Sequence, residues 1–344
     1  MSRRTAPIPD PCDLSFSGDI RHPDLWLWDS WTIQSGEGHL HLYCLALSRT
    51  DFDGSAILPP QRNDHSFHIR HFRSADNGLS WRDQGVAIQP GGASDGADAF
   101  NVWSGSVIMG KTGQTLFGYT GVRNISPART FLQTICVGAV PTPDAMGFYL
   151  GPLDRLGDRA GEEGGPIMAW RDPFLVRDHN DELNAFWSAK IGPTRPAIAR
   201  ARLTEGPAGV SMTELLPPIE LPDAAEYTQS EVPKLYHDKA SDLWLLLVSA
   251  CNRQYEGQPD SEVEFQQRLY TSASLDGQWE SALVSGSVLT GLDGMFGCSL
   301  VDHDLVAGTL SVLGPFTEQA GPEKQLSFPP VRNISLTSVS GPAA

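Results

Sequence analysis

The sequence predicts an all-β protein with a single domain, and a β-propeller is the architecture that explains it best. Apolar segments of four to eight residues recur along almost the whole chain and are bounded by Gly, Pro, Asn and Asp, which is typical of short antiparallel strands. The 34 Gly and 26 Pro among 344 residues indicate many turns, and no segment has the periodicity of a convincing amphipathic helix. Barrels and sandwiches also reach this length, but a propeller better explains the even spread of turns.

The expected strands follow one another along the chain, and several are rich in β-branched and aromatic residues. They span Leu25–Ile33, His39–Leu47, Phe67–Phe72, Val102–Met109, Thr115–Tyr119, Phe131–Val140, Phe174–Val176, Leu183–Trp187, Leu243–Ser249 and Leu305–Leu313. One short helical turn is expected within Asp223–Gln229, and Pro233 prevents its extension.

One turn carries a sequence motif of propeller blades. Residues 74–81 read S-A-D-N-G-L-S-W and fit S-x-D-x-G-x-x-W, which recurs in the blades of sialidases and related proteins. Asp76 can bond to turn amides, Gly78 permits the backbone of the turn, and Trp81 can pack on the strand. A looser copy lies at 274–279. The motif predicts a blade and carries no information about catalysis.

Charge and hydropathy narrow the range of partners. There are 25 Lys and Arg against 41 Asp and Glu, a formal net charge of −16, and there is no basic run. Such a chain would repel a phosphate backbone, so no nucleic-acid partner is expected. The longest apolar run, Leu243–Val248, is too short to span a bilayer, so no membrane partner is expected. A neutral or cationic small molecule is the expected partner, and the sequence does not predict the oligomeric state.

Cysteine usage and the first residues bear on the compartment. Neither a C-x-x-C pair nor an apolar stretch after Arg3 and Arg4 is present, so we expect no signal peptide and a cytoplasmic location. No cofactor and no metal ion are expected. Reduced and mostly buried thiols are expected at the five cysteines, which are Cys12, Cys44, Cys136, Cys251 and Cys298.

Three acids lie where the apolar pattern should exclude them. Asp29 is surrounded by three tryptophans and three aliphatic residues, and burying an ionised carboxylate without a reason is costly. Asp172 lies between Arg171 and Pro173 and interrupts an apolar segment. Glu231 is followed by Val-Pro, which forces an extended backbone and fixes the direction of its side chain.

Each acid also has an ordinary structural explanation. Asp29 could bond to neighbouring amides at a strand end, Asp172 could belong to an ion pair or a bulge, and Glu231 could be a surface residue. The three occur in order at the edges of separate predicted blades, and strand edges converge on the axis of a propeller. Two such acids on one sugar would supply the pair that glycoside cleavage needs.

Four blocks of sequence resemble the signature blocks of glycoside hydrolase family 68, the levansucrase and β-fructofuranosidase family. They read W-D-S-W at 28–31, W-S-G-S at 103–106, R-D-P at 171–173 and S-E-V-P at 230–233. The related invertase and inulinase family shares the R-D-P block. The similarity runs from about Trp26 to about Leu313.

The resemblance implies a five-bladed β-propeller with a funnel-shaped axial pocket. Residues 1–344 would form one catalytic domain, with an N-terminal extension at 1–20 and a C-terminal closing segment at 315–344. Asp29 would be the nucleophile, Asp172 the transition-state stabiliser that holds fructosyl hydroxyls, and Glu231 the acid/base. The residues implied to bind substrate are Trp28, Trp103, Ser104 and Arg171 on the fructosyl side, and Arg253 and Tyr270 near the glucosyl side.

The chain also departs from the family. Val232 stands where the family usually has Arg, which affects the contacts that tune Glu231 and bind an acceptor. The calcium site of the family cannot be located in this sequence. The chain is short for the family, so trimmed peripheral loops are expected.

The implied activity is that of a retaining β-fructofuranosidase that hydrolyses sucrose through a covalent fructosyl-enzyme. The alternative is a levansucrase-type transfructosylase, and more distant alternatives are a sialidase-like enzyme or a non-catalytic sugar-binding propeller. The mechanism requires a separation of about 5 to 5.5 Å between the carboxyls of Asp29 and Glu231. It predicts a raised pKa for Glu231 and a normal or lowered pKa for Asp29.

Three other patterns have structural explanations. Residues 105–112 satisfy the P-loop pattern, but they read as strand where a P-loop requires a helix. His65, His68 and His71 have metal-like spacing, but on a strand His68 faces away from the other two. A Ser/His/Asp triad lacks support because no G-x-S-x-G sequence is present.

Overall fold

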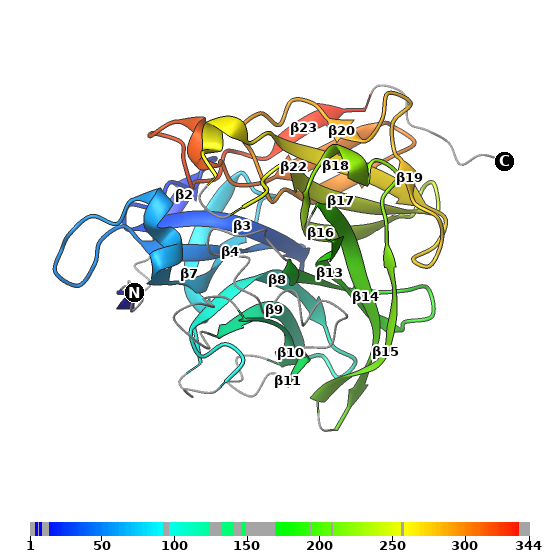
Figure 1. The fold of residues 1–344 in the computed structure, drawn as a ribbon, viewed down its shortest axis with the longest axis horizontal. Coiled ribbons are helices and arrows are strands. Elements are labelled where there is room, and N and C mark those ends of the chain that lie inside the picture. Colours follow the sequence, from blue (N-terminus) through cyan, green and yellow to red (C-terminus); the bar gives the residue numbers. More distant parts are fainter. Residues whose placement is uncertain are drawn as a thin grey trace.

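The computed structural model describes residues 4–5, 7–8, 14–91, 96–123, 132–139, 146–148, 169–192, 194–207, 209–255 and 258–336. Five antiparallel sheets fan out around one centre, which confirms the predicted five-bladed β-propeller (Figure 1). The helices among these residues are short 3-10 turns, and none of them is long and apolar enough to cross a membrane.

The first two blades come from the N-terminal half of the chain. From the axis outwards, blade 1 contains β3 (Leu25–Gln34), β4 (Leu40–Ser48), β6 (His68–Ser74), β7 (Ser80–Ile88) and β2 (Ser15–Ser17). Blade 2 contains β8 (Asn101–Met109), β9 (Thr115–Arg123), β10 (Leu132–Ala139) and β11 (Met146–Phe148). A separate parallel pair joins β1 (Arg4–Thr5) and β5 (His65–Ser66).

The other three blades follow in chain order. Blade 3 contains β12 (Trp170–Arg177), β13 (Leu183–Gly192), β14 (Arg195–Gly206) and β15 (Gly209–Ile219). Blade 4 contains β16 (Gln229–Asp238), β17 (Leu243–Cys251), β18 (Phe265–Ser272), β19 (Glu280–Ser281) and β20 (Val288–Leu289). Blade 5 contains β21 (Ser299–Asp304), β22 (Thr309–Leu313) and β23 (Arg332–Ser335). The 3-10 turns are η1 (Pro59–Asp64), η2 (Ala224–Glu226), η3 (Asp260–Glu262) and η4 (Glu318–Ala320).

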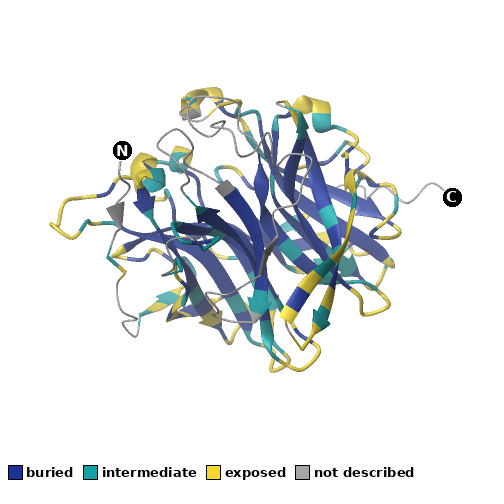
Figure 2. Cartoon of the chain, turned by 60° about the horizontal axis from the view of Figure 1, so that its bottom comes forward, coloured by how far each residue is buried: buried dark blue, intermediate teal, exposed yellow. Residues whose placement is uncertain are grey.

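The blades pack face to face and bury one apolar cluster at each of the five junctions. In blades 1 to 4 the second strands from the axis are therefore covered on both faces over most of their length, and β17 is buried along its whole length. In blade 5, β21 and β22 are partly exposed. Outer strands such as β7 alternate between exposed and buried residues. Figure 2 shows this difference as dark inner strands and exposed outer edges and turns.

The inner strands close the ring. β3 contacts β8, β8 contacts β12, β12 contacts β16, β16 contacts β21, and β21 contacts β3. The closure also uses the C-terminal part of the chain, because the Leu27 amide donates to the Leu326 carbonyl at 2.9 Å. Ile20 and Phe328 pair by two backbone hydrogen bonds of 2.9 and 3.1 Å. The axis is thus surrounded by five strand edges.

The turn motif of blade 1 forms as predicted. The Ser80 amide donates to Asp76 at 2.8 Å, Gly78 has a φ of +88°, and Trp81 is buried. The expected helical turn is η2. The described cysteines, at 44, 136, 251 and 298, are buried free thiols as expected, and Cys12 lies outside the described residues.

The strand predicted over Leu305–Leu313 was wrong in its first half. Residues 305–308 form the turn between β21 and β22, because the Gly308 amide bonds back to the Leu305 carbonyl and Gly308 has a φ of +67°. Apolar composition alone did not distinguish this turn from the strand that follows it.

Candidate active site

An irregularity occurs in four inner strands where the four sequence blocks lie. The strand register shifts at Asp29 in β3, at Ser104 in β8, after Arg171 in β12 and after Glu231 in β16. Each is a β-bulge, which turns a side chain out of the regular alternation. The bulges explain why polar residues interrupt apolar strands at these points.

The backbone at three of these bulges is strained. The φ angles of Asp29, Asp172 and Val232 are 27°, 63° and 47°, in a region that L-residues rarely adopt. Val232 is the most unusual, since β-branched side chains are disfavoured there, and the extended backbone expected before Pro233 was wrong. Strain of this kind costs about 1–3 kcal/mol per residue and occurs preferentially at functional sites.

A cavity of about 480 Å³ opens at these bulges. Asp29, Asp172 and Glu231 all line it, so three acids from three different blades meet in one pocket. Its size is that of a pocket for a small molecule. Trp28, Trp103 and Phe67 add aromatic surface to its wall, which suits the apolar face of a sugar ring.

Asp172 is held rigidly by neighbouring donors. The hydroxyl of Ser104 donates to its Oδ1 at 2.5 Å, and that of Ser188 to its Oδ2 at 3.1 Å. The amide of Val232 donates to Oδ2 at 3.2 Å, so the strained bulge of β16 supplies one of the contacts. Arg171 Nε lies 3.8 Å from Oδ2. These partners fix the carboxylate in place.

Glu231 is paired with Arg171. The Nη2 atom of Arg171 lies 3.3 Å from Oε1 of Glu231, and its guanidinium lies 5.9 Å from the centre of the Trp103 ring. Burial raises the pKa of Glu231, Arg171 opposes this shift, and the charge of Asp172 adds to it. The raised pKa agrees with the expectation for a general acid.

Asp29 differs from its expected state. Burial, followed by the charges of Asp172 and Glu231, raises its pKa from 3.8 to about 7, although Arg62 and Lys234 act in the opposite direction. The expected normal or lowered pKa of Asp29 was wrong. The sequence predicted that the three acids converge on the axis, but it did not predict how strongly burial and like charges at close range raise the pKa of Asp29.

A buried lysine lies next to Asp29. Lys234 of β16 is fully buried, and its Nζ donates to the carbonyls of Gly297 and Cys298 at 2.7 Å each. Gly297 in turn packs against Asp29, because a Cβ atom built at Gly297 would lie 3.4 Å from Oδ1 of Asp29. The φ of +70° at Gly297 also favours glycine. Burial lowers the pKa of Lys234 to about 8, and the neighbouring acids oppose this shift.

The six predicted binding residues divide into three groups: four that line the pocket, one that lies behind an acid, and one that lies outside the pocket. Trp28, Trp103, Arg171 and Arg253 line the pocket, as the resemblance implied. Ser104 is fully buried and does not line the pocket, but it orients Asp172. Ser104 therefore lies behind Asp172 and not on the side of Asp172 that faces the pocket.

Tyr270 was predicted wrongly as a binding residue. Its side chain is fully buried in the apolar cluster between blades 3 and 4. Its hydroxyl donates to Asp223 at 2.6 Å. The motif around Tyr270 is that of a packed strand, and Tyr270 does not line the axial pocket.

The rim of the pocket was not predicted from the sequence. It includes Arg62 of η1 and Glu318 of η4, which form an ion pair across more than 250 positions of sequence. Asn63, Gln258, Phe316 and Thr317 also line the pocket. These residues lie in loops without a distinctive motif, so only the fold brings them together.

The other patterns have the structural explanations that the sequence favoured. Residues 105–112 run from β8 into a turn before β9, so no P-loop forms. His68 is buried in β6, whereas His71 stacks on Tyr43 and bonds to His41 at 2.9 Å. The three histidines therefore do not converge on one point.

Solved structures share this fold at low sequence identity. A Bacillus subtilis levansucrase in complex with oligosaccharides has a TM-score of 0.64 and 15% identity, covering 93% of this chain and 87% of that chain. A B. megaterium levansucrase variant has a TM-score of 0.64 and 15% identity, covering 95% and 88%. An inulosucrase from Halalkalicoccus jeotgali bound to kestose has a TM-score of 0.64 and 18% identity, covering 99% and 96%.

These likenesses confirm the predicted resemblance to the levansucrase family at the level of the fold. No protein family defined by sequence matches the chain, and no curated protein is similar to it in sequence. The fold and the pocket define a five-bladed propeller with three acids in its axial pocket. The fold alone is shared with the levansucrase structures.

Proposed function

We propose that this protein cleaves sucrose through a covalent fructosyl-enzyme and transfers the fructosyl group to a sugar acceptor. The observation that carries the proposal is the meeting of Asp29, Asp172 and Glu231 on bulged inner strands in one axial pocket. Two carboxyls around one sugar are the minimum for retaining glycoside cleavage, one as nucleophile and one as acid/base.

In the first step, the carboxylate of Asp29 attacks the anomeric carbon of the fructosyl residue. The bond from this carbon to the bridging oxygen breaks, and protonated Glu231 gives its proton to that oxygen, which leaves as a glucose hydroxyl. The reacting carbon gains positive charge at the transition state, which offsets the burial and the charges of Asp172 and Glu231 that raise the pKa of Asp29. Asp172, held by its four partners, would bind fructosyl hydroxyls.

In the second step, Glu231 acts as the base. It takes the proton of an acceptor hydroxyl while the acceptor oxygen attacks the same carbon from the face that glucose left, and the bond to Asp29 breaks. Two displacements give net retention of configuration. The mechanism needs a proton on Glu231 in the first step and none in the second, and its position beside Arg171 suits both states.

The comparisons favour transfer over hydrolysis, whereas the sequence alone favoured hydrolysis. The neighbours are levansucrases and an inulosucrase, and one levansucrase structure contains oligosaccharides while the inulosucrase is bound to kestose. Arg62 and Arg253 line the pocket and supply cationic groups to it. Hydrolysis of sucrose is the second candidate, since water can replace the acceptor in the same step.

The test is to incubate the protein with sucrose and to measure free glucose and free fructose. Each cleavage releases one glucose, and each hydrolysis also releases one fructose. We expect a clear deficit of fructose, accompanied by oligosaccharide or polymer products. Equal amounts would replace transfer by hydrolysis. No glucose at all would reject cleavage of sucrose, and sialoside cleavage or fructoside binding without turnover would then support the more distant alternatives.

A further inference from the structure

Two histidines and an aspartate meet between blades 3 and 4. His179 lies in the turn between β12 and β13, His237 near the end of β16, and Asp242 in the turn that leads into β17. One ligand atom from each residue lies within 4.8 Å of the other two. His179 and Asp242 are exposed and His237 is half-buried, so the cluster is open to solvent.

The cluster is separate from the axial pocket. Glu231 is the third residue of β16 and His237 the ninth, so the two positions are six residues apart along the strand. At about 3.3 Å per residue this places the cluster about 20 Å along the strand from the acids. The pocket opens at the start of the inner strands, and the cluster lies where β12 and β16 end.

The turns that carry the cluster are fixed by their own acids. Oδ1 of Asp178 accepts the amides of Asn180 and Glu182 at 2.9 Å each, on either side of the turn that presents His179. In the other turn, Asp238 accepts the amide of Ser241 at 2.9 Å. Both turns are therefore organised without any ligand, which reduces the entropy that binding would cost.

The distances suit a divalent cation. Nε2 of His237 lies 3.1 Å from Oδ1 of Asp242. Two adjacent ligands of a tetrahedral zinc ion, each about 2.0–2.1 Å from the metal, lie about 3.3 Å apart. A cation can thus replace the proton that the two atoms now share. The ring of His179 packs edge-on against that of His237 with their centroids 4.5 Å apart, so it lies beside this position.

The donor set selects the kind of metal. Two imidazole nitrogens and one carboxylate oxygen suit zinc and its neighbours in the first transition row, whereas calcium and magnesium prefer oxygen ligands alone. Three protein ligands leave a fourth position for water. Asp242 also supplies negative charge, which two neutral histidines would lack.

Trp244 reports on this position. Its Nε1 donates to Nε2 of His179 at 3.2 Å, and its ring lies 5.0 Å from that of His237. A cation bound by His179 either displaces this hydrogen bond or uses the other ring nitrogen. In both cases the surroundings of the buried indole change, which gives an optical signal of binding.

We propose that His179, His237 and Asp242 form a zinc-class cation site that joins the hairpins of blades 3 and 4. A cation that binds only the folded state stabilises it in proportion to the logarithm of its concentration over Kd. The role is structural, because the site lies far from the acids.

The experiment is titration of the untagged full-length protein with zinc chloride, followed by calorimetry, Trp fluorescence and thermal unfolding. Zinc should bind with one-to-one stoichiometry, change the fluorescence and raise Tm. Calcium chloride at the same concentration should have none of these effects. His179→Gln and Asp242→Asn change exposed residues, so their folds should persist, and each should weaken zinc binding at least tenfold. His39→Gln, a matched change at a histidine that lies 3.4 Å from Glu37, should bind zinc like the unchanged protein.

The proposal is overturned if the unchanged protein binds no zinc at millimolar concentration. It is also overturned if His179→Gln and Asp242→Asn retain full affinity, or if calcium gives the same rise in Tm. Sucrose cleavage should be equal with and without a chelator, and a loss of activity with the chelator would reject the purely structural role.

Discussion

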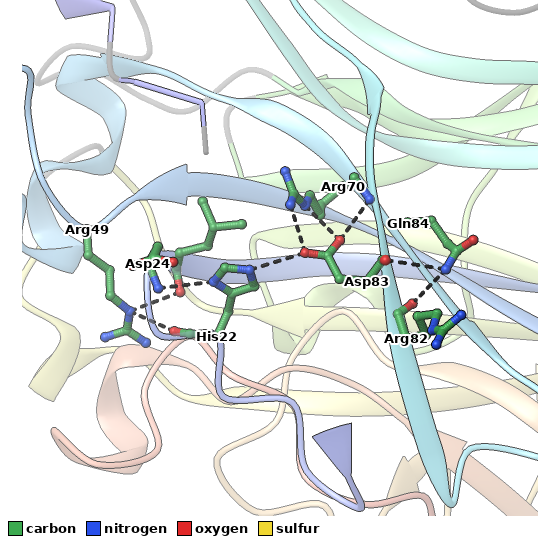
Figure 3. Close-up of polar contacts among 9 residues, drawn as sticks. His22, Asp24, Arg49, Arg70, Arg82, Asp83 and Gln84 are labelled. Atoms are coloured by element: carbon green, nitrogen blue, oxygen red, sulfur yellow. Dashed lines mark hydrogen bonds and ion pairs between the residues drawn. The ribbon is translucent and has the colours of Figure 1, made fainter. Parts of the chain in front are cut away.

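Two carboxyls of blade 1, those of the buried Asp83 and the half-buried Asp29, have opposite environments. Asp83 in β7 accepts Nε and Nη2 of Arg70 at 2.9 and 2.7 Å, and the amide of Gly85 at 2.8 Å (Figure 3). His22 also contacts Asp83, at 3.3 Å. Nδ1 of His22 accepts the amide of Asp24 at 3.1 Å, so its Nε2 carries the hydrogen that points to Asp83.

The two environments shift the two carboxyls in opposite directions. Burial alone would raise the pKa of Asp83, but the hydrogen bonds from His22, Arg70 and Gly85 outweigh it and lower the pKa to about 2. Asp29 has two acids as neighbours and a pKa of about 7. No hydrogen bond to the side-chain carboxyl of Asp29 occurs among the residues that the structure describes.

The comparison teaches how to separate structural from reactive acids. A carboxylate with a complete set of donors belongs to the framework, because its charge is already balanced. A carboxyl that lines a cavity beside other acids is available to a ligand and gains when positive charge develops nearby. The contrast predicts that changes at Asp29 affect activity and changes at Asp83 affect stability.

The largest expected effect is on activity at Asp29. Asp29→Asn removes the nucleophile and nearly preserves the shape, so we expect sucrose cleavage to fall by at least about 10³-fold. Glu231→Gln should reduce kcat by about 10²- to 10⁴-fold, because it removes the proton donor. Initial rates of glucose release, with circular dichroism to verify folding, measure both.

The matched control is Asp83→Asn, assayed at a temperature where it is folded. Its kcat should stay within about twofold of the unchanged protein. If it loses activity as strongly as Asp29→Asn while folded, the distinction between the two regions fails.

The next effect is on stability at Asp83. Asp83→Asn removes the charged partner that Arg70 has in a buried ion pair, and changes of this kind cost about 3–5 kcal/mol. Chemical denaturation should show this loss in Asp83→Asn and a much smaller loss, or a gain, in Asp29→Asn. Equal losses in both variants would contradict the account.

A smaller effect is expected at Ser104, behind Asp172. Ser104→Ala deletes the 2.5 Å hydrogen bond to Asp172 but leaves the contacts from Ser188 and Val232. A hydrogen bond to a charged group is worth about 1.5–3 kcal/mol, which corresponds to about a ten- to hundredfold loss of kcat/KM. Ser104→Thr keeps a hydroxyl and should recover part of the loss. Steady-state kinetics on sucrose measure kcat/KM for both variants, and equal losses in the two would contradict a role for the hydroxyl.

The smallest effect is the dependence on pH. Asp29 must be ionised to attack, so kcat/KM should fall about tenfold per unit as the pH falls below about 7. In stability, the raised pKa of Asp29 favours the folded state at low pH, and this contribution is lost as the pH rises from about 4 through 7. The lowered pKa of Asp83 acts oppositely: its contribution is present above about pH 4 and is lost as the pH falls to about 2.

Denaturation of the unchanged protein and of the two Asn variants between about pH 2 and 8 would separate the two contributions to stability. Asp83→Asn should remove the loss of stability at the acid end. Asp29→Asn should remove part of the decline toward neutral pH. Unchanged pH profiles in both variants would show that the two carboxyls titrate normally.

Of the five innermost strands, β3, β8 and part of β12 were predicted from the sequence, whereas β16 and β21 were missed. Strands covered on both faces, such as β4 and β17, are continuous apolar runs, and acids on bulges interrupt such runs visibly. Strands β14 and β15 were missed because their exposed faces carry charges, as at Arg200 and Arg202, which pair with Asp276 of the next blade. Contacts between residues that are far apart in the sequence, such as the ion pair of Arg62 and Glu318, leave no local pattern in the sequence.

The central claim is that Asp29 forms a covalent bond with the fructosyl group. The most direct test is to mix the protein with sucrose, quench with acid within the first turnovers, and map the modified peptide by mass spectrometry. The account predicts a fructosyl unit on the peptide that contains Asp29, and none in Asp29→Asn. Glucose release by the unchanged protein with the fructosyl unit on another residue would contradict it.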